Sequence, residues 1–180
     1  MKPAIFLSLL ILAAAPSGAK EKPVKTAPSE IDSLLRYSLP DGWSVERKAA
    51  ATDPSIRADD GNDIIKIRLY GGKGSRYAAP ENFIEGFEAM TMGRPPESKG
   101  EMKVAGRVAT VYSHGYPIEL GDPHAVGGAP PKMAREQFLI LPAGRRFVVL
   151  SYARETSIPD PARAGEKAWA AFLKSIALAR

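Results

Sequence analysis

Cysteine is absent from the 180-residue sequence. Its absence excludes disulfide bonds, thiolate catalysis and cysteine-based zinc sites. It also excludes a lipid anchor of the lipoprotein kind, which is attached to a cysteine at the cleavage point. A folded chain of this composition must be stabilised by its hydrophobic core alone.

The sequence also lacks any block of charge of one sign. Lysine and arginine number 25 against 20 aspartates and glutamates, which gives a net charge of +5. The basic residues are spread along the chain rather than gathered in a run. A mixed surface of this kind supports a mild attraction to anionic surfaces and no more. We therefore predict that nucleic acid is not a partner.

The sequence contains only one long apolar run. The 12 apolar or small residues from Ala4 to Ala15 follow Lys2 and precede Pro16-Ser17-Gly18-Ala19. This order is typical of a secretory signal peptide, and the run is shorter than the roughly 20 residues that span a bilayer. We expect residues 1–19 to be a cleaved signal peptide and the product to be periplasmic or secreted, with no transmembrane segment in the mature chain.

The remaining residues predict one folded unit. Residues 20–35 indicate a linker and then a short helix, which starts at Ser29 with the capping-box-like order Ser-Glu-Ile-Asp. Residues 36–180 predict a single domain in which strands follow one another without helical crossovers. The expected fold class is α+β, with a mainly antiparallel sheet flanked by helices in an α/β/α sandwich.

Apolar periodicity places the individual elements. The clearest strand is expected over residues 63–70, where isoleucine and leucine alternate with charged residues. A helix is expected from Pro80, with Phe83, Phe87 and Met90 on one face. The other expected elements are a short strand around Ile56, a strand or hairpin over 102–112, a hairpin of 135–141 and 147–153, and a closing helix capped by Asp160-Pro161 with Trp169, Phe172, Leu173 and Ile176 on its apolar face.

Motifs of the common enzyme classes are missing. The glycine-rich segment 71–75 follows a strand, but its lysine is followed by glycine, so the spacing of a phosphate-binding loop fails. No Gly-x-Ser-x-Gly motif is present. The acidic segment 59–63 lacks the calcium-loop pattern and fits a turn better. We expect a protein that is not an enzyme and needs no cofactor, with a hydrolase of unfamiliar geometry as an open alternative.

Both histidines of the chain, His114 and His124, lie in one short segment together with Glu119 and Asp122. These four residues supply the ligand types that Zn²⁺ or Mn²⁺ prefers. The glycines and prolines between them preclude a helix that would bring both histidines to one face. Histidines in such a position are more commonly ordinary surface groups.

The same segment also predicts a contact surface. Residues 114–132 contain four glycines and four prolines, and we expect them to form a long irregular loop. Loops of this length are usually functional or disordered. Tyr116, Ile118 and Leu120 alternate within it and are the candidate partner-binding residues.

The order of the motifs resembles that of the PsbP/DcrB-like superfamily of small exported proteins. The motifs are Leu39-Pro40-Asp41-Gly42-Trp43, Pro80-Glu81-Asn82-Phe83, Val104-Ala105-Gly106-Arg107-Val108-Ala109, the hairpin of 135–141 and 147–152, and Phe172-Leu173-Lys174-Ser175-Ile176. The resemblance spans about residues 36–178 and implies an antiparallel sheet between helices. It also implies a non-enzymatic accessory role, and some photosynthetic members are associated with metal ions. No motif carries a binding residue over to this sequence.

Two functional hypotheses follow. The first is an exported, non-enzymatic accessory or binding protein that acts through a surface for an unidentified protein partner in the cell envelope. The alternative is a metal-binding envelope protein that holds Zn²⁺ or Mn²⁺ with His114 and His124.

Overall fold

A computed structural model of the chain describes residues 29–91, 93–119, 132–159 and 161–179. The described elements are, in chain order, α1 (Glu30–Leu34), β1 (Leu35–Arg36), β2 (Ser44–Lys48), β3 (Ser55–Asp59), β4 (Asp63–Tyr70), α2 (Pro80–Met90), β5 (Glu97–Val104), β6 (Arg107–Glu119), β7 (Lys132–Ala143), β8 (Arg146–Glu155), α3 (Ala164–Ser175) and β9 (Ala177–Leu178). The predicted signal peptide lies outside the described residues.

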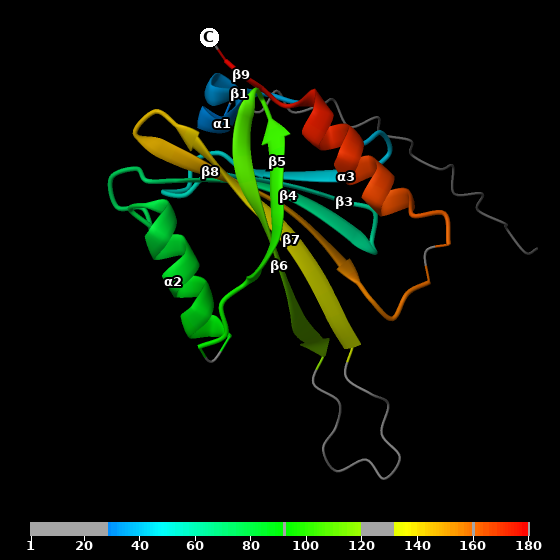
Figure 1. The fold of residues 1–180 in the computed structure, drawn as a ribbon. Helices are drawn as coiled ribbons and strands as arrows, with labels where there is room; N and C mark the ends of the chain where they lie inside the picture. Colours follow the sequence, from blue (N-terminus) through cyan, green and yellow to red (C-terminus); the bar gives the residue numbers. More distant parts are fainter. Residues whose placement is uncertain (1–28, 92, 120–131, 160, 180) are drawn as a thin grey trace, which may run out of the picture.

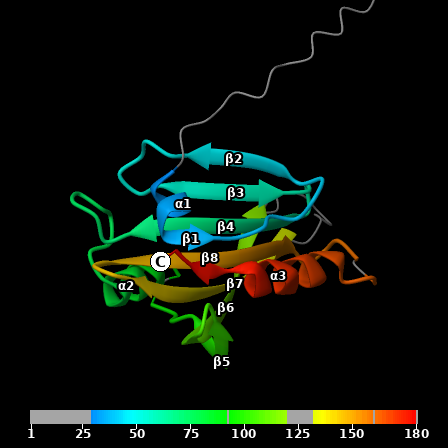
Figure 2. The same ribbon diagram turned by 90° about the horizontal axis from the view of Figure 1, so that it is seen from above.

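Seven strands form one open antiparallel sheet in the order β2-β3-β4-β8-β7-β6-β5, which Figure 2 shows from above. Every neighbouring pair of strands in this sheet is antiparallel. Figure 1 shows α2 and α3 on opposite sides of the sheet, and β1 and β9 pair with each other at one end of it. The predicted α+β sandwich with a mainly antiparallel sheet is therefore confirmed.

The first face of the sheet carries the larger core. The side chains that alternate along β4 at Ile65, Ile67 and Leu69 are at most 1% exposed. They pack with the apolar side chains of α3, led by Trp169 and Phe172, and with α1. Burial of an aromatic or aliphatic side chain of this size stabilises the fold by about 1.5–3 kcal/mol. This face is covered by helices α1 and α3.

The second face carries a smaller, mainly aromatic core under α2. Phe83 and Phe87 of α2 pack on Phe138 of β7, with ring centroids 5.6 and 5.2 Å from that ring. Tyr70 of β4 and Phe147 of β8 complete the cluster. This core occupies one end of the second face, where the 11 residues of α2 pack. The other end of the same face is left uncovered by α2.

The predicted helix starts are partly confirmed. Ser29 caps α1 and forms a complete capping box with Asp32. Pro80 occupies the first turn of α2, as its fixed φ favours. The prediction that Asp160-Pro161 caps α3 is wrong, because α3 begins at Ala164 after a left-handed Arg163.

The reason lies in a residue far away in the sequence. Asp63 of β4 is buried and accepts a hydrogen bond of 2.5 Å from Tyr152. Its carboxylate lies directly against Gly165 in the first turn of α3, where any Cβ would overlap it. A carboxylate at this end of a helix interacts favourably with the helix dipole. The first turn of α3 thus has a negative partner from the sheet in addition to its own Glu166.

The prediction of an irregular loop over residues 114–132 is wrong for its first part. His114 to Glu119 continue β6 and pair with β7, from His114 opposite Glu136 to Glu119 opposite Lys132. The pairing of β6 with β5 ends at Ser113, so this part of β6 is an edge strand. An edge strand tolerates Pro117, which cannot donate a ladder hydrogen bond. Residues 120–131 lie outside the described residues.

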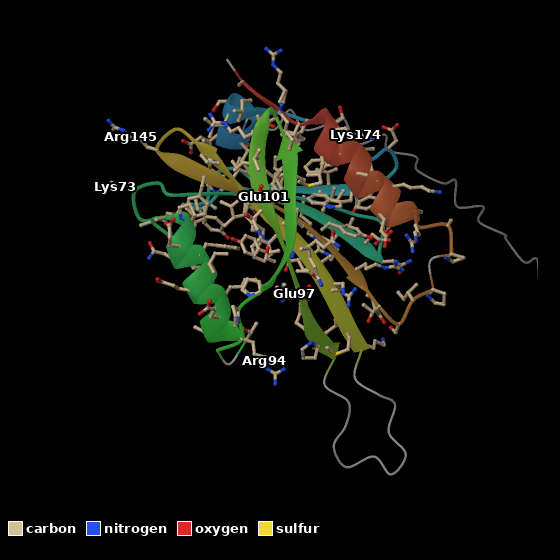
Figure 3. All side chains as sticks on the ribbon, in the orientation of Figure 1. Lys73, Arg94, Glu97, Glu101, Arg145 and Lys174 are labelled. Atoms are coloured by element: carbon tan, nitrogen blue, oxygen red, sulfur yellow. The ribbon has the colours of Figure 1, made fainter. Side chains whose placement is uncertain are left out.

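The two outer strands of the sheet are polar and exposed. All five residues of β2 and seven of the eight residues of β5 are exposed. Glu97 and Glu101, which mark β5 in Figure 3, flank a register shift between Ser98 and Glu101. Glu97 also forms an ion pair with Lys99 along the strand.

Candidate functional site

The candidate site is the part of the second sheet face that α2 leaves open. Cross-strand register fixes which residues share this face: Lys66 lies opposite Ser151, and Glu136 lies opposite both Ala153 and His114. The polar side chains meet next to the end of the aromatic core. Four strands therefore contribute polar groups to the middle of the sheet: β4 contributes Lys66 and Arg68, and β8, β7 and β6 contribute one each.

Glu136 is the centre of this group and is only 8% exposed. Its Oε1 accepts a hydrogen bond of 3.0 Å from Nη2 of Arg68, and its Oε2 lies 3.1 Å from Nε2 of His114. The same Nη2 donates to Oγ of Ser151 at 2.9 Å. Each carboxylate oxygen of Glu136 thus has a strong partner of its own, as a buried charge requires.

These partners decide the charge of Glu136. Burial alone would raise its pKa, but the hydrogen bond from His114, the charge of Arg68, a hydrogen bond from Ser151 and the charge of Lys66 outweigh burial. Together they lower the pKa of Glu136 to about 2. Glu136 is therefore an anion at any physiological pH and can only accept hydrogen bonds.

His114 is held in place on several sides. Since Glu136 only accepts, Nε2 of His114 carries the hydrogen that joins them. The His114 ring meets Phe87 of α2 edge-on at a centroid distance of 4.1 Å and stacks on Tyr116 at 5.2 Å. Its Nδ1 atom is buried and has no hydrogen-bond partner. His114 is thus a packed residue of the sheet face, with its ring fixed in one orientation.

A cleft lined by basic residues lies beside Glu136, between β2, β3 and β4. It has a volume of about 200 Å³, and its basic lining residues are Lys48, Arg57, Lys66 and Arg68. Lys66 is half-buried, and burial is the main reason that its pKa is lowered. The charges of Arg68 and Arg57 lower the pKa further, while the charge of Glu136 raises it. The cleft offers several hydrogen-bond donors to an anion.

An apolar pocket lies on the same face, near the start of β4 and β7 and near the end of β6 and β8. Its volume is about 210 Å³, and its floor is formed by Ile64, Ala134 and Ala153. Tyr116 and Ile118 form its side on β6. Ile118 is 48% exposed. The open face therefore combines a basic cleft with an apolar hollow and an exposed apolar side chain beside it.

A second apolar groove, of about 470 Å³, lies between α2 and the β6 side of the sheet. Ile84 of α2, Val108 and Tyr112 of β6 and Ile140 of β7 line it. Charged side chains are limited there to Glu81 and Glu85 of α2. This groove lies apart from the Glu136 group.

The structure describes only some of the residues that the sequence singles out. Tyr116 and Ile118 lie together at the apolar pocket, while Leu120 falls outside the described residues. His114 forms a hydrogen bond with Glu136, a residue that the sequence did not single out. Asp122 and His124 lie outside the described residues, as does the side chain of Glu119. Metal binding by this set stays a prediction, and the described residues contain no group of three or more acidic or histidine side chains placed to hold a metal ion.

Sequence reasoning missed Glu136, Arg68 and Lys66. Charged residues that alternate with apolar ones in a strand favour a solvent-facing row, and Lys66 and Arg68 fit that pattern. The sequence contains one usable signal for a polar site, an excess of charged residues on one face of two separate strands. This signal identifies which residues meet only when the pairing of the strands is known.

Comparisons with known proteins identify no family. A scan against protein-family models finds no match, and a search of curated proteins finds none. Among solved structures, the chain is similar to LpqN, described as involved in cell envelope biogenesis of Mycobacterium tuberculosis. The identity is 11% and the TM-score 0.45, over 80% of this chain and 82% of LpqN. A similarity at this level carries no functional information, so membership of the PsbP/DcrB-like superfamily stays a prediction.

Within the described ranges, no helix has both the length and the apolar character that a bilayer span requires.

Proposed function

We propose that this protein is an exported, non-enzymatic binding protein that takes a protein partner of the cell envelope on the open part of its second sheet face. The observation that supports this function most directly is the exposed apolar surface at the end of β6. There Ile118 is 48% exposed beside a hollow floored by Ile64, Ala134 and Ala153. Exposed apolar side chains that gather around a hollow are typical of interaction sites.

The side chains of this face are suited to binding rather than to turnover. Glu136 is locked as an anion between Arg68 and His114. Ser151 donates to Glu136 and accepts from Arg68, so it is not paired with the imidazole of His114 as a nucleophile would need to be. A rigid polar centre of this kind fixes the shape of the face, and the apolar and basic groups around it supply the contacts.

Site-specific photo-crosslinking tests the proposal. A photoreactive amino acid replaces Ile118 in one variant and Val108 in a control variant, because both are exposed apolar residues of β6. We expect one repeated adduct from the envelope fraction at position 118 and none at position 108. The captured protein, once purified, should bind the wild type and lose at least about ten-fold in affinity for Ile118→Asp but not for Val108→Asp.

The opposite results would contradict the proposal. They are an absence of any adduct at position 118, an equal adduct at position 108, or equal affinity of the captured protein for all three chains.

A further inference from the structure

Three basic side chains lie together on the open face, two of them in direct opposition. Arg57 of β3 and Lys66 of β4 are cross-strand partners, and Arg68 follows Lys66 on the same face. Like charges directly opposite each other destabilise an antiparallel pair. Such a pair is retained at a cost in folding stability, which a bound anion would remove.

Two of the three cations already have acidic partners. Nε of Arg57 lies 2.9 Å from Oδ2 of Asp59, and Nη2 of Arg68 lies 3.0 Å from Oε1 of Glu136. Lys66, by contrast, forms no ion pair with an acidic residue in the described part of the chain. It is also the most central of the three, because it lies directly opposite Arg57 and two positions before Arg68 on the same face.

The balance of charge indicates what is missing. At the rim of the cleft, Lys48 is paired with Glu46 at 3.4 Å. The carboxylates of Glu46, Asp59 and Glu136, in and around the cleft, are each paired with one cation. Of the four basic residues that line the cleft, Lys66 alone has no such pair within the described residues. One surplus positive charge matches a ligand group with a single negative charge, such as a carboxylate, better than a phosphate dianion.

We propose that the cleft over Lys66 is a binding site for a carboxylate group, which forms an ion pair with Lys66 and is flanked by Arg57 and Arg68. The volume of about 200 Å³ accommodates such a group. Ile64 lies on the same face of β4, two positions before Lys66, and lines the apolar pocket beside Ile118. The inference deepens the proposed function and rests on it in one respect: the carboxylate is that of an acidic side chain or chain end of the partner that covers Ile118.

The first experiment uses the purified protein and needs no partner. Acetate is titrated at constant ionic strength against chloride, while NMR follows the side-chain signals of Lys66 and the backbone amides of Arg57 and Arg68. We expect a saturable shift with acetate and none with chloride. The Lys66→Met variant, which removes the like-charge contact and should melt no lower than the wild type, should weaken binding by at least about ten-fold.

Lys73 provides a matched control. It is exposed in the segment after β4, and Figure 3 shows it at the periphery of the molecule, away from the sheet. Lys73→Met should bind acetate as the wild type does. Shifts that do not saturate, that occur equally with chloride, or that persist in Lys66→Met would overturn the carboxylate site.

The second experiment identifies the molecule that carries the carboxylate. The protein captured at position 118 is tested against Lys66→Met, and a loss of about ten-fold or more in affinity assigns the carboxylate to that partner. Acetate binding with unchanged partner affinity supports the site and assigns it to a small carboxylate ligand. If acetate does not bind but Ile118→Asp still abolishes partner binding, the carboxylate site fails and the proposed function stands.

Discussion

The burial of Glu136 predicts how the folding stability of the domain depends on pH. Its pKa lies at about 2 in the folded protein against 4.5 for an ordinary glutamate. A difference of this size corresponds to about 3 kcal/mol of folding stability. A domain is commonly stable by only about 5–15 kcal/mol, so this one carboxylate supplies a large fraction.

The direction in which stability changes with pH follows from the lowered pKa of Glu136. A carboxyl group whose pKa is lowered by folding stabilises the folded state above its unfolded pKa. Its contribution is therefore complete above about pH 5 and is lost progressively as the pH falls through 4.5 toward 2. Glu136→Gln should remove this contribution, so the wild type and the variant should differ most at neutral pH and converge near pH 2.

Urea unfolding followed by circular dichroism from about pH 7 to about pH 2 measures the difference. Glu101→Gln is the control, because Glu101 is exposed on β5. That variant should follow the wild type at every pH. A Glu136→Gln variant that stays parallel to the wild type down to pH 2, or a Glu136 carboxyl that titrates near 4.5 by NMR, would refute the reasoning.

Three glycines give further predictions. Gly86→Ala would bring its Cβ to 2.6 Å from Cε1 of the buried Tyr77, and thermal unfolding should show a net loss of about 1–3 kcal/mol despite the better helix propensity of alanine. Gly115→Ala meets only Ala134 O, at 3.6 Å, and should be close to neutral in the same assay. Gly165→Ala would overlap the Asp63 carboxylate and should cost more than Gly86→Ala, because the obstacle is a buried charge. A Gly165→Ala variant as stable as the wild type would contradict the account of how α3 begins.

The core of the fold could be predicted from local patterns because the relevant signals are local. The alternation of Ile65, Ile67 and Leu69 identifies both a strand and its buried face. The stripe of Trp169, Phe172 and Leu173 identifies α3 in the same way. These patterns depend only on the period of the backbone, so they need no knowledge of what each element packs against.

The candidate site depends on distant pairings that no local pattern contains. Glu136 takes its partners from His114, 22 positions away, and from Arg68, 68 positions away. Period-two alternation separates the two faces of a strand, but it does not tell whether the second face is covered. Lys66 therefore fits a solvent-facing row until β3 is paired beside it.

The loop prediction for residues 114–119 failed for a related reason. Gly115 and Pro117 weaken a strand in the interior of a sheet, where the strand pairs on both sides. Beyond Ser113, β6 has lost β5 and pairs with β7 alone. Whether a strand is central or at an edge is a property of the assembled sheet.

The exposed outer strands have a consequence for how this protein behaves at high concentration. An open sheet with bare edges is prone to add strands from other copies and to aggregate. Here β2 carries Glu46, Arg47 and Lys48, and β5 carries a register shift and a row of charged side chains. Charges and irregularities of this kind oppose strand addition. The chain is thus built to resist polymerising edge to edge along β2 and β5.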